Sequence, residues 1–174
     1  MGELVVNDIE ALTTPLQDWD FKNSPKDPFL FAQEMVSEVW NNNGLGIAAN
    51  QLGYPWKVFA MRGQPENFCC FNPRIVMPST ETIVLEEGCL SFPGLVFKIR
   101  RPQHVRVRFA APTGEVMTRM FTGMTARVFQ HEMTHMNAQI FFAGLSRLKI
   151  DTAIKKAKKL GVDYTGMNLL RYAK

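Results

Sequence analysis

Residues 131–135 read HEMTH, and this pattern constrains the fold of the chain more than any other. Each residue of an α-helix turns the chain by about 100°, so His131 and His135 lie one above the other and can share one ion. Glu132 is about 100° away from His131 and can flank that ion without binding it. The H-E-x-x-H arrangement supplies two zinc-type ligands and a general base. Two core histidines on an amphipathic helix are the alternative interpretation.

A catalytic metal site needs a third protein ligand and keeps one position for water. No histidine follows His135, so this ligand must come from elsewhere in the chain. Cys89 is the candidate, because it follows Gly88 where a predicted strand gives way to a turn. Cys69 and Cys70 are adjacent in an extended stretch, point to opposite faces and are expected to pack in the core. Packing is also the alternative role of Cys89.

Helices enclose a block of short strands in the predicted element order. The first helix follows Asp27 as its N-cap and Pro28 in its first turn, and it ends before Gly44. Further helices are expected at about 123–137 and 151–161. Strands are expected at 58–61, 82–85 and 105–109, with turns at Asn72-Pro73, Pro93-Gly94 and Pro112-Thr113-Gly114. This order and the 46% of apolar residues predict a single α+β domain over residues 1–174.

Residues 44–51 read GLGIAANQ and form the third notable segment. Two glycines and two alanines let the backbone pass close to a ligand, and the Gln51 amide can donate to an anion. The segment is not a phosphate-binding loop, because the required Gly-Lys-Ser/Thr is missing. A tight packing turn between helix and strand is the alternative.

Together these segments resemble the peptide deformylase family. That family is marked by a G-apolar-G-apolar-A-A-x-Q loop, an E-G-C-L-S segment and a Q-H-E-x-D-H helix, which correspond here to residues 44–51, 87–91 and 130–135. The similarity extends from the first helix to about Lys149, and it implies small antiparallel sheets packed around a central HExxH helix. One residue departs from the pattern: Thr134 replaces the family's Asp, so we expect Arg101 to lack a charged partner.

The resemblance implies removal of the formyl group from the N-terminal formyl-methionine of nascent polypeptides, with release of formate. Cys89, His131 and His135 would hold one divalent metal ion with a position left for water. Glu132 would take the proton of the water and return it to the departing amine. Gln51 and the backbone N–H of Leu90 would stabilise the oxyanion. The family characteristically uses iron(II), and the same ligands also suit zinc, nickel and cobalt.

An apolar pocket for the methionine side chain is expected beside the metal. Met124 and Val128 lie on the stripe of the HExxH helix that continues backward from the histidines. The remaining expected substrate-binding residues are carried over from the resemblance: Leu45, Gly46, Leu85 and Gly88. A core position would explain Leu85 nearly as well.

Charge and composition indicate the compartment and the partners. The opening residues lack a signal-peptide pattern, no apolar run is long enough to span a bilayer, and three cysteines are too few for a disulfide framework, so the cytoplasm is expected. From residue 145 to residue 174 there are eight Lys or Arg and two Asp, a charge of +6 in a chain of +4. The Lys-rich helix at 151–161 is predicted to be a solvated surface or a ribosome contact. We expect no sequence-specific nucleic-acid binding, and residues 162–174 match no pattern.

Two other function classes fit some of these residues. An HExxH peptidase would cleave ordinary amide bonds, but such enzymes often take their third ligand from a downstream His or Glu, which is missing here. A non-catalytic metal-binding or peptide-binding domain would not need Glu132 or Gln51 to hold an ion.

Overall fold

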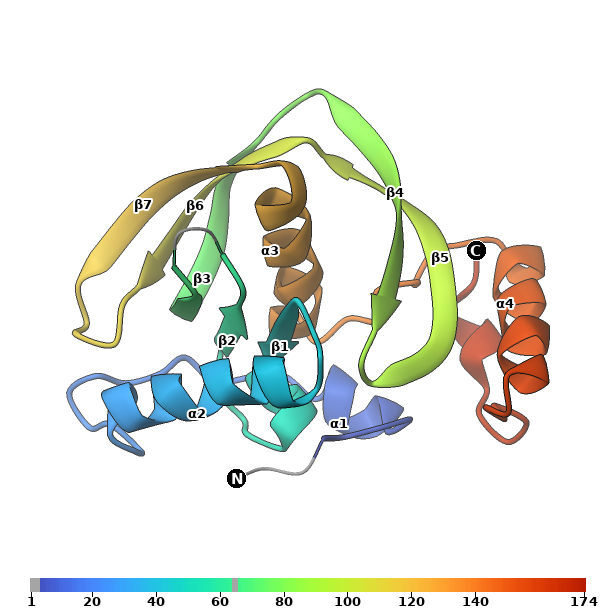
Figure 1. The fold of residues 1–174 in the computed structure, drawn as a ribbon, viewed down its shortest axis with the longest axis horizontal. Coiled ribbons are helices and arrows are strands. Elements are labelled where there is room, and N and C mark those ends of the chain that lie inside the picture. The colour runs from blue at the N-terminus through green and yellow to red at the C-terminus, as the bar shows by residue number, and fades with distance from the viewer. Residues whose placement is uncertain (1–3, 64–65) are drawn as a thin grey trace.

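The computed structural model describes residues 4–63 and 66–174 and has the predicted α+β architecture (Figure 1). In chain order, the elements are α1 (Ile9–Thr13), α2 (Pro28–Asn41), β1 (Gly46–Ala48), η1 (Ala49–Leu52), β2 (Val58–Met61), β3 (Phe68–Pro78), β4 (Thr82–Cys89), β5 (Phe92–Pro102), β6 (His104–Ala110), β7 (Val116–Thr122), α3 (Gly123–Met136), α4 (Arg147–Lys159) and η2 (Leu169–Tyr172).

Two antiparallel sheets enclose the helix that carries the HEMTH pattern. The larger sheet has the strand order β1-β2-β3-β6-β7, and the smaller one is the hairpin β4-β5. Figure 1 shows α3 running between the large sheet and the hairpin, with α2 below and α4 outside the hairpin. The expectation of small antiparallel sheets packed around a central HExxH helix is therefore confirmed.

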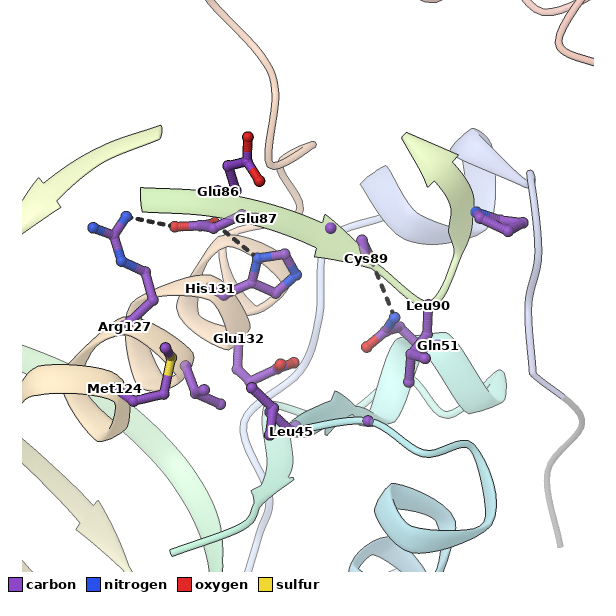
Figure 2. A pocket seen from close by; sticks show the side chains of 15 residues that line it. Leu45, Gln51, Glu86, Glu87, Cys89, Leu90, Met124, Arg127, His131 and Glu132 are labelled. Atoms are coloured by element: carbon purple, nitrogen blue, oxygen red, sulfur yellow. Dashed lines mark hydrogen bonds and ion pairs between the residues drawn. The ribbon is translucent and has the colours of Figure 1, made fainter. Parts of the chain in front are cut away.

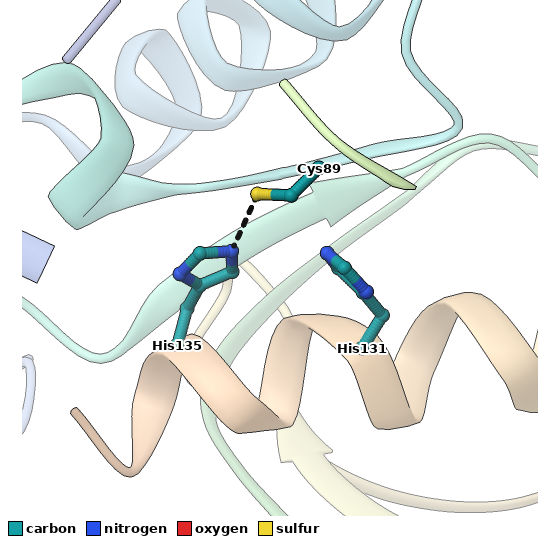
Figure 3. Close-up of side chains that lie close together, drawn as sticks. All are labelled: Cys89, His131 and His135. Carbon is teal, nitrogen blue, oxygen red and sulfur yellow. Dashed lines mark hydrogen bonds between the residues drawn. The ribbon is translucent and has the colours of Figure 1, made fainter. Parts of the chain in front are cut away.

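Apolar residues on one face of α3 fix the rotation of this helix. Phe129 is fully buried against the large sheet, where its ring lies 5.0 Å from that of Phe59. Met133, one helical turn later, belongs to the same core cluster. Burial of each such side chain stabilises the fold by roughly 1.5–3 kcal/mol. With this face held on the large sheet, His131 and His135 are turned towards the hairpin (Figure 3).

The predicted helices were found with small shifts at their ends. The Asp27 carboxylate accepts hydrogen bonds from the backbone N–H groups of Phe29 and Leu30, each at 2.9 Å, and so caps α2 as expected. Helix α4 begins at Arg147 rather than near residue 151 and ends at Lys159. Strand β2 has its predicted bounds, whereas β4 and β6 are longer than predicted.

Two of the predicted turns lie inside strands. Asn72 and Pro73 are part of β3, where the pairing with β6 shifts between Phe71 and Arg74. Asn72 adopts the left-handed conformation at φ 49°, and its side chain bonds both the N–H and the C=O of Trp19. Turn-forming residues here produce a bulge that anchors the N-terminal segment. The third predicted turn, at 112–114, is confirmed.

Pro93 and Gly94 likewise belong to β5 instead of forming a turn. The chain reverses earlier, because Cys89 pairs with Phe92 and only two residues separate them. Gly94 has a φ of 76°, so the irregular backbone that the sequence indicated is present, but within the strand.

None of the helices in the described residues combines the length and the apolar character that a membrane span requires.

Candidate active site

The three predicted metal ligands come together between the hairpin and α3. Cys89 ends β4, while His131 and His135 project from α3 (Figure 3). The Cys89 Sγ lies 3.4 Å from His135 Nε2, and the ligand atoms of all three residues lie within 4.8 Å of one another. Ligand atoms around a tetrahedral ion with bonds of about 2.0–2.3 Å are separated by roughly 3.5 Å. One thiol and two imidazoles at these distances fit a single divalent ion.

The Glu87 carboxylate joins the hairpin to the ligand helix. It accepts hydrogen bonds from Arg101 at 2.6 and 2.8 Å. Arg127 donates to it at 2.7 Å, and His131 Nδ1 lies 3.0 Å from it (Figure 2). Burial alone would raise the pKa of Glu87, but the hydrogen bonds from Arg101 and His131 hold it well below its usual range. The ionised carboxylate accepts the Nδ1–H of His131 and leaves Nε2 available for a metal.

Arg101 retains a charged partner, contrary to expectation. Its guanidinium pairs with Glu87, which is buried, and a further N–H donates to the carbonyl of Gln130 at 3.2 Å. Thr134 accepts from the same guanidinium at 3.4 Å and donates to Gln130 C=O at 3.1 Å. The replacement at position 134 therefore leaves α3 continuous and Arg101 paired.

Burial sets the protonation of the site in the absence of metal. Burial raises the pKa of Glu132 to about 8 and that of Cys89 to about 12, and it lowers the pKa of His135 to about 3. His135 is therefore neutral, the form that binds metal. The charge of a bound dication favours the thiolate and the carboxylate, so metal binding releases protons.

Glu132 is held beside the ligands with one oxygen unpaired. Its side chain is 3% exposed, and its Oε2 has no hydrogen-bond partner among residues 4–63 and 66–174. A Cβ at Gly46 would lie 2.5 Å from Glu132 Oε1 and 2.9 Å from Val128, so only glycine fits there. A buried carboxylate oxygen without a protein partner, next to the candidate metal ligands, is available to bind a water or a substrate that enters the site.

The GLGIAANQ segment forms β1 and a single turn of 3₁₀ helix, and it directs the Gln51 amide towards Cys89. The Gln51 Oε1 accepts from the backbone N–H of Ala48 at 2.9 Å, which fixes the orientation of the amide. Its Nε2 donates to Ser91 Oγ at 3.0 Å. The same nitrogen lies 3.5 Å from Cys89 Sγ (Figure 2). The Gln51 amide is therefore a fixed donor next to the candidate metal ligand Cys89.

A cavity of about 400 Å³ opens beside these residues, a size within the usual range of ligand sites. Leu45 and Met124 are half-exposed at its rim, and Val128 is buried at its wall. Gly46, Gly88 and Leu90 also line the cavity. Leu85 is not among the lining residues that the structure describes, and it is half-buried in β4 opposite Ile99. The role of Leu85 in substrate binding therefore stays a prediction.

No role was predicted from the sequence for Glu87 or Arg127. The spacing of each residue from a predicted metal ligand could have indicated a role in the site. Glu87 is two residues before Cys89, so the two side chains share one face of the strand. Arg127 precedes His131 by four residues, and these two side chains share one face of the helix.

Comparisons with known proteins agree on one family. The family model described as polypeptide deformylase matches residues 1–151. The peptide deformylase of Wolbachia sp. subsp. Brugia malayi (strain TRS) is 36% identical over 144 residues, which are 75% of this chain and 80% of the relative. That of Wolbachia pipientis subsp. Culex pipiens (strain wPip) is 34% identical and covers 92% of this chain and 96% of its own.

Solved structures of the same name have similar folds. The peptide deformylase of Synechococcus elongatus, crystallised in complex with actinonin, superposes with a TM-score of 0.79 at 25% identity and covers 90% of this chain and 86% of its own. The Thermotoga maritima protein has a TM-score of 0.72 at 30% identity, with 82% and 95% covered.

We predict that Glu87→Gln weakens metal binding about 10- to 100-fold, because the His131 ring loses the charged group that orients it. Zn²⁺ affinity is measured by competition with a chromogenic chelator. Glu86→Gln, at the exposed neighbouring position, serves as the control and retains the affinity of the wild type. Equal affinities for all three proteins would contradict a role of Glu87 in orienting the ligand.

Proposed function

The chain belongs to the peptide deformylase family, and we propose which of its residues carry out the reaction of that family. The protein is a metal-dependent hydrolase that removes the formyl group from the N-terminal formyl-methionine of nascent polypeptides and releases formate. The observation that supports the proposed roles best is the placement of the unpaired Glu132 carboxylate oxygen beside Cys89 and the two histidines.

Cys89, His131 and His135 are proposed to hold the metal through sulfur and two ring nitrogens. When bound there, a divalent ion supplies a Lewis acid and a water of lowered pKa. A set of one thiolate and two imidazoles accepts iron(II), zinc, nickel or cobalt, and we propose iron(II) in the cell.

Glu132 is the proposed general base and then general acid. Water adds to the formyl carbon as Glu132 takes its proton, and the C–N bond breaks as the same carboxyl returns a proton to the amine nitrogen. The products are formate and a free amino terminus. Burial raises the pKa of Glu132, whereas a bound dication would favour the ionised carboxylate, and these opposing effects suit a group that first takes a proton and then returns it.

Gln51 and the backbone N–H of Leu90 are the proposed oxyanion donors. Gln51 is fixed by its bonds to Ala48 and Ser91, so little reorganisation is needed when negative charge develops on the formyl oxygen. Leu90 lies in the two-residue turn after Cys89 and lines the same cavity.

The substrate is proposed to place its methionine side chain against the apolar wall of the cavity. Leu45, Met124 and Val128 supply this wall, and Met124 is a flexible side chain that can adapt to a thioether. Gly46 and Gly88 leave room for the substrate backbone, because neither position fills the cavity with a side chain.

We also propose that residues 1–174 form one catalytic domain that acts in the cytoplasm, where nascent polypeptides are made. A second contact, with the ribosome, is proposed through α4. Its lysines at 155, 156, 158 and 159 are exposed, whereas Ala153 and Ala157 face the core. Lys155 and Lys158 pair with Asp151 and Asp163, which leaves Lys156 and Lys159 without an ion pair among the described residues. Such lysines attract a polyanion.

We predict that Glu132→Gln lowers the rate of formate release from formyl-Met-Ala-Ser by about 10²- to 10⁴-fold, because the site loses its proton acceptor. Bound metal, measured by elemental analysis, is retained because Glu132 is not a proposed ligand. The exposed Glu115→Gln variant is the control for the charge change. Unblocked Met-Ala-Ser is assayed beside the substrate, and its cleavage by the wild type would indicate a peptidase instead.

The proposal of iron(II) predicts that enzyme purified without oxygen contains iron and loses activity in air. Oxidation of the iron or of the Cys89 thiolate is the physical cause. Metal content and formate release are measured before and after exposure to air, with zinc-loaded enzyme as the comparison. An iron-free preparation that is fully active and stable in air would exclude this assignment.

For the ribosome contact, we expect the double substitution of Lys156 and Lys159 by Ala to reduce co-sedimentation with ribosomes. The dependence of log affinity on log salt becomes shallower by about 2, because two phosphate contacts are lost. Substituting the exposed Lys22 and Arg119 by Ala removes the same charge far from α4 and is the matched control. Binding that is absent or insensitive to salt would reject the contact.

A further inference from the structure

The C-terminal segment, residues 160–174, follows α4 and lies beyond residues 1–151, which the family model matches. No pattern was recognised in the sequence of residues 162–174. In the structure this segment packs against the hairpin that carries Cys89. Tyr164 is 2% exposed and belongs to the same core cluster as Cys89, Phe92 and Leu169. Figure 1 shows the C-terminal segment and α4, in orange and red, beside β5. The C-terminal segment thus covers the outside of the hairpin, opposite α3.

The Tyr164 hydroxyl donates a hydrogen bond to the carbonyl of Pro93 at 2.7 Å. Pro93 lines the active-site cavity and follows the turn that contains Leu90 and Ser91. Burial raises the pKa of Tyr164 to about 12, and the proximity of Cys89 adds to this effect, so the hydroxyl remains a donor. One bond therefore connects the C-terminal segment to the backbone next to the proposed ligand and oxyanion donor.

Close packing strengthens this connection at the next residue. A Cβ at Gly94 would lie 3.4 Å from the Cβ of Ala157 and 3.7 Å from Val162 Cγ2. An added methyl group would thus be in van der Waals contact with α4 and with the start of the C-terminal segment, so β5 lies close to both at this residue.

Two other hydrogen bonds hold the turn between β4 and β5 through Ser91. The backbone N–H of Asn7 donates to the carbonyl of Ser91 at 2.9 Å, and Gln51 Nε2 donates to Ser91 Oγ at 3.0 Å. Residues 89–93 are thus held by the N-terminal segment, by the GLGIAANQ loop and by Tyr164. Of these three contacts, only the hydrogen bond from Tyr164 comes from a residue that follows the turn in the sequence.

We propose that Tyr164 is a positioning residue of the deformylation site: its hydroxyl fixes the Pro93 carbonyl and thereby the positions of Cys89 Sγ and the Leu90 N–H. This inference depends on the roles proposed above for Cys89 and Leu90. Catalytic groups displaced by about 1 Å can lose 10²-fold in rate, so a single bond that fixes their backbone has a measurable effect.

The experiment uses the full-length enzyme loaded with Co²⁺, and it compares wild type, Tyr164→Phe and Tyr172→Phe. Phenylalanine keeps the buried ring and removes only the hydroxyl. Tyr172 is the matched control because it lies in the same segment and its hydroxyl accepts a bond from the exposed Arg171. Three quantities are measured: kcat and KM for formyl-Met-Ala-Ser, the thiolate-to-cobalt absorption band, and the midpoint of thermal unfolding.

We expect Tyr164→Phe to lower kcat about tenfold with a smaller change in KM, because oxyanion donors act mainly in the transition state. The thiolate-to-cobalt band shifts in this variant and is unchanged in Tyr172→Phe. A lower unfolding temperature with unchanged kcat and absorption would show a purely structural role and overturn the proposal, as would wild-type behaviour throughout. If the wild type releases no formate, the proposed function fails, and the absorption band alone decides whether Tyr164 positions Cys89.

Discussion

The buried Glu87 carboxylate is the interaction on which the geometry of the site depends. It lies on β4 two residues before Cys89 and contacts Arg101 of β5 and both Arg127 and His131 of α3. A buried charge is tolerated only when its partners are well placed, and loss of one partner typically costs about 3–5 kcal/mol. The cluster therefore penalises any shift of the hairpin along the helix. Because Cys89 and His131 lie on the same two elements, the metal-binding distances are maintained by the same constraint.

Local patterns in the sequence predicted the part of the site that depends on local geometry. The helical spacing of His131 and His135 fixes their relative position whatever the tertiary structure. The position of Cys89 at the end of a strand could also be predicted from the sequence. The contacts of Glu87 were not predicted, because they depend on which strand packs against α3, and the spacing of residues along the chain does not determine that packing.

The errors in the fold prediction have a common physical cause. Asn72-Pro73 and Pro93-Gly94 are residues that form turns in isolation, but here both pairs lie within strands. In β3 the left-handed Asn72 forms a bulge, and its side chain makes hydrogen bonds to the backbone of Trp19, which is 53 residues away in the sequence. Tertiary hydrogen bonds thus determined whether the irregular backbone ended the strand or only bent it.

The two sheets of the protein share no strand, and each of them packs against α3 from a different side. The hairpin contributes sulfur to the proposed metal group, whereas the helix packed on the large sheet contributes both imidazoles. An ion that bridges these groups would fasten one half of the molecule to the other. Ligands that bind only the native state raise its stability by mass action. With an ion bound as proposed, the resistance of this protein to unfolding would rise with the supply of metal in its surroundings.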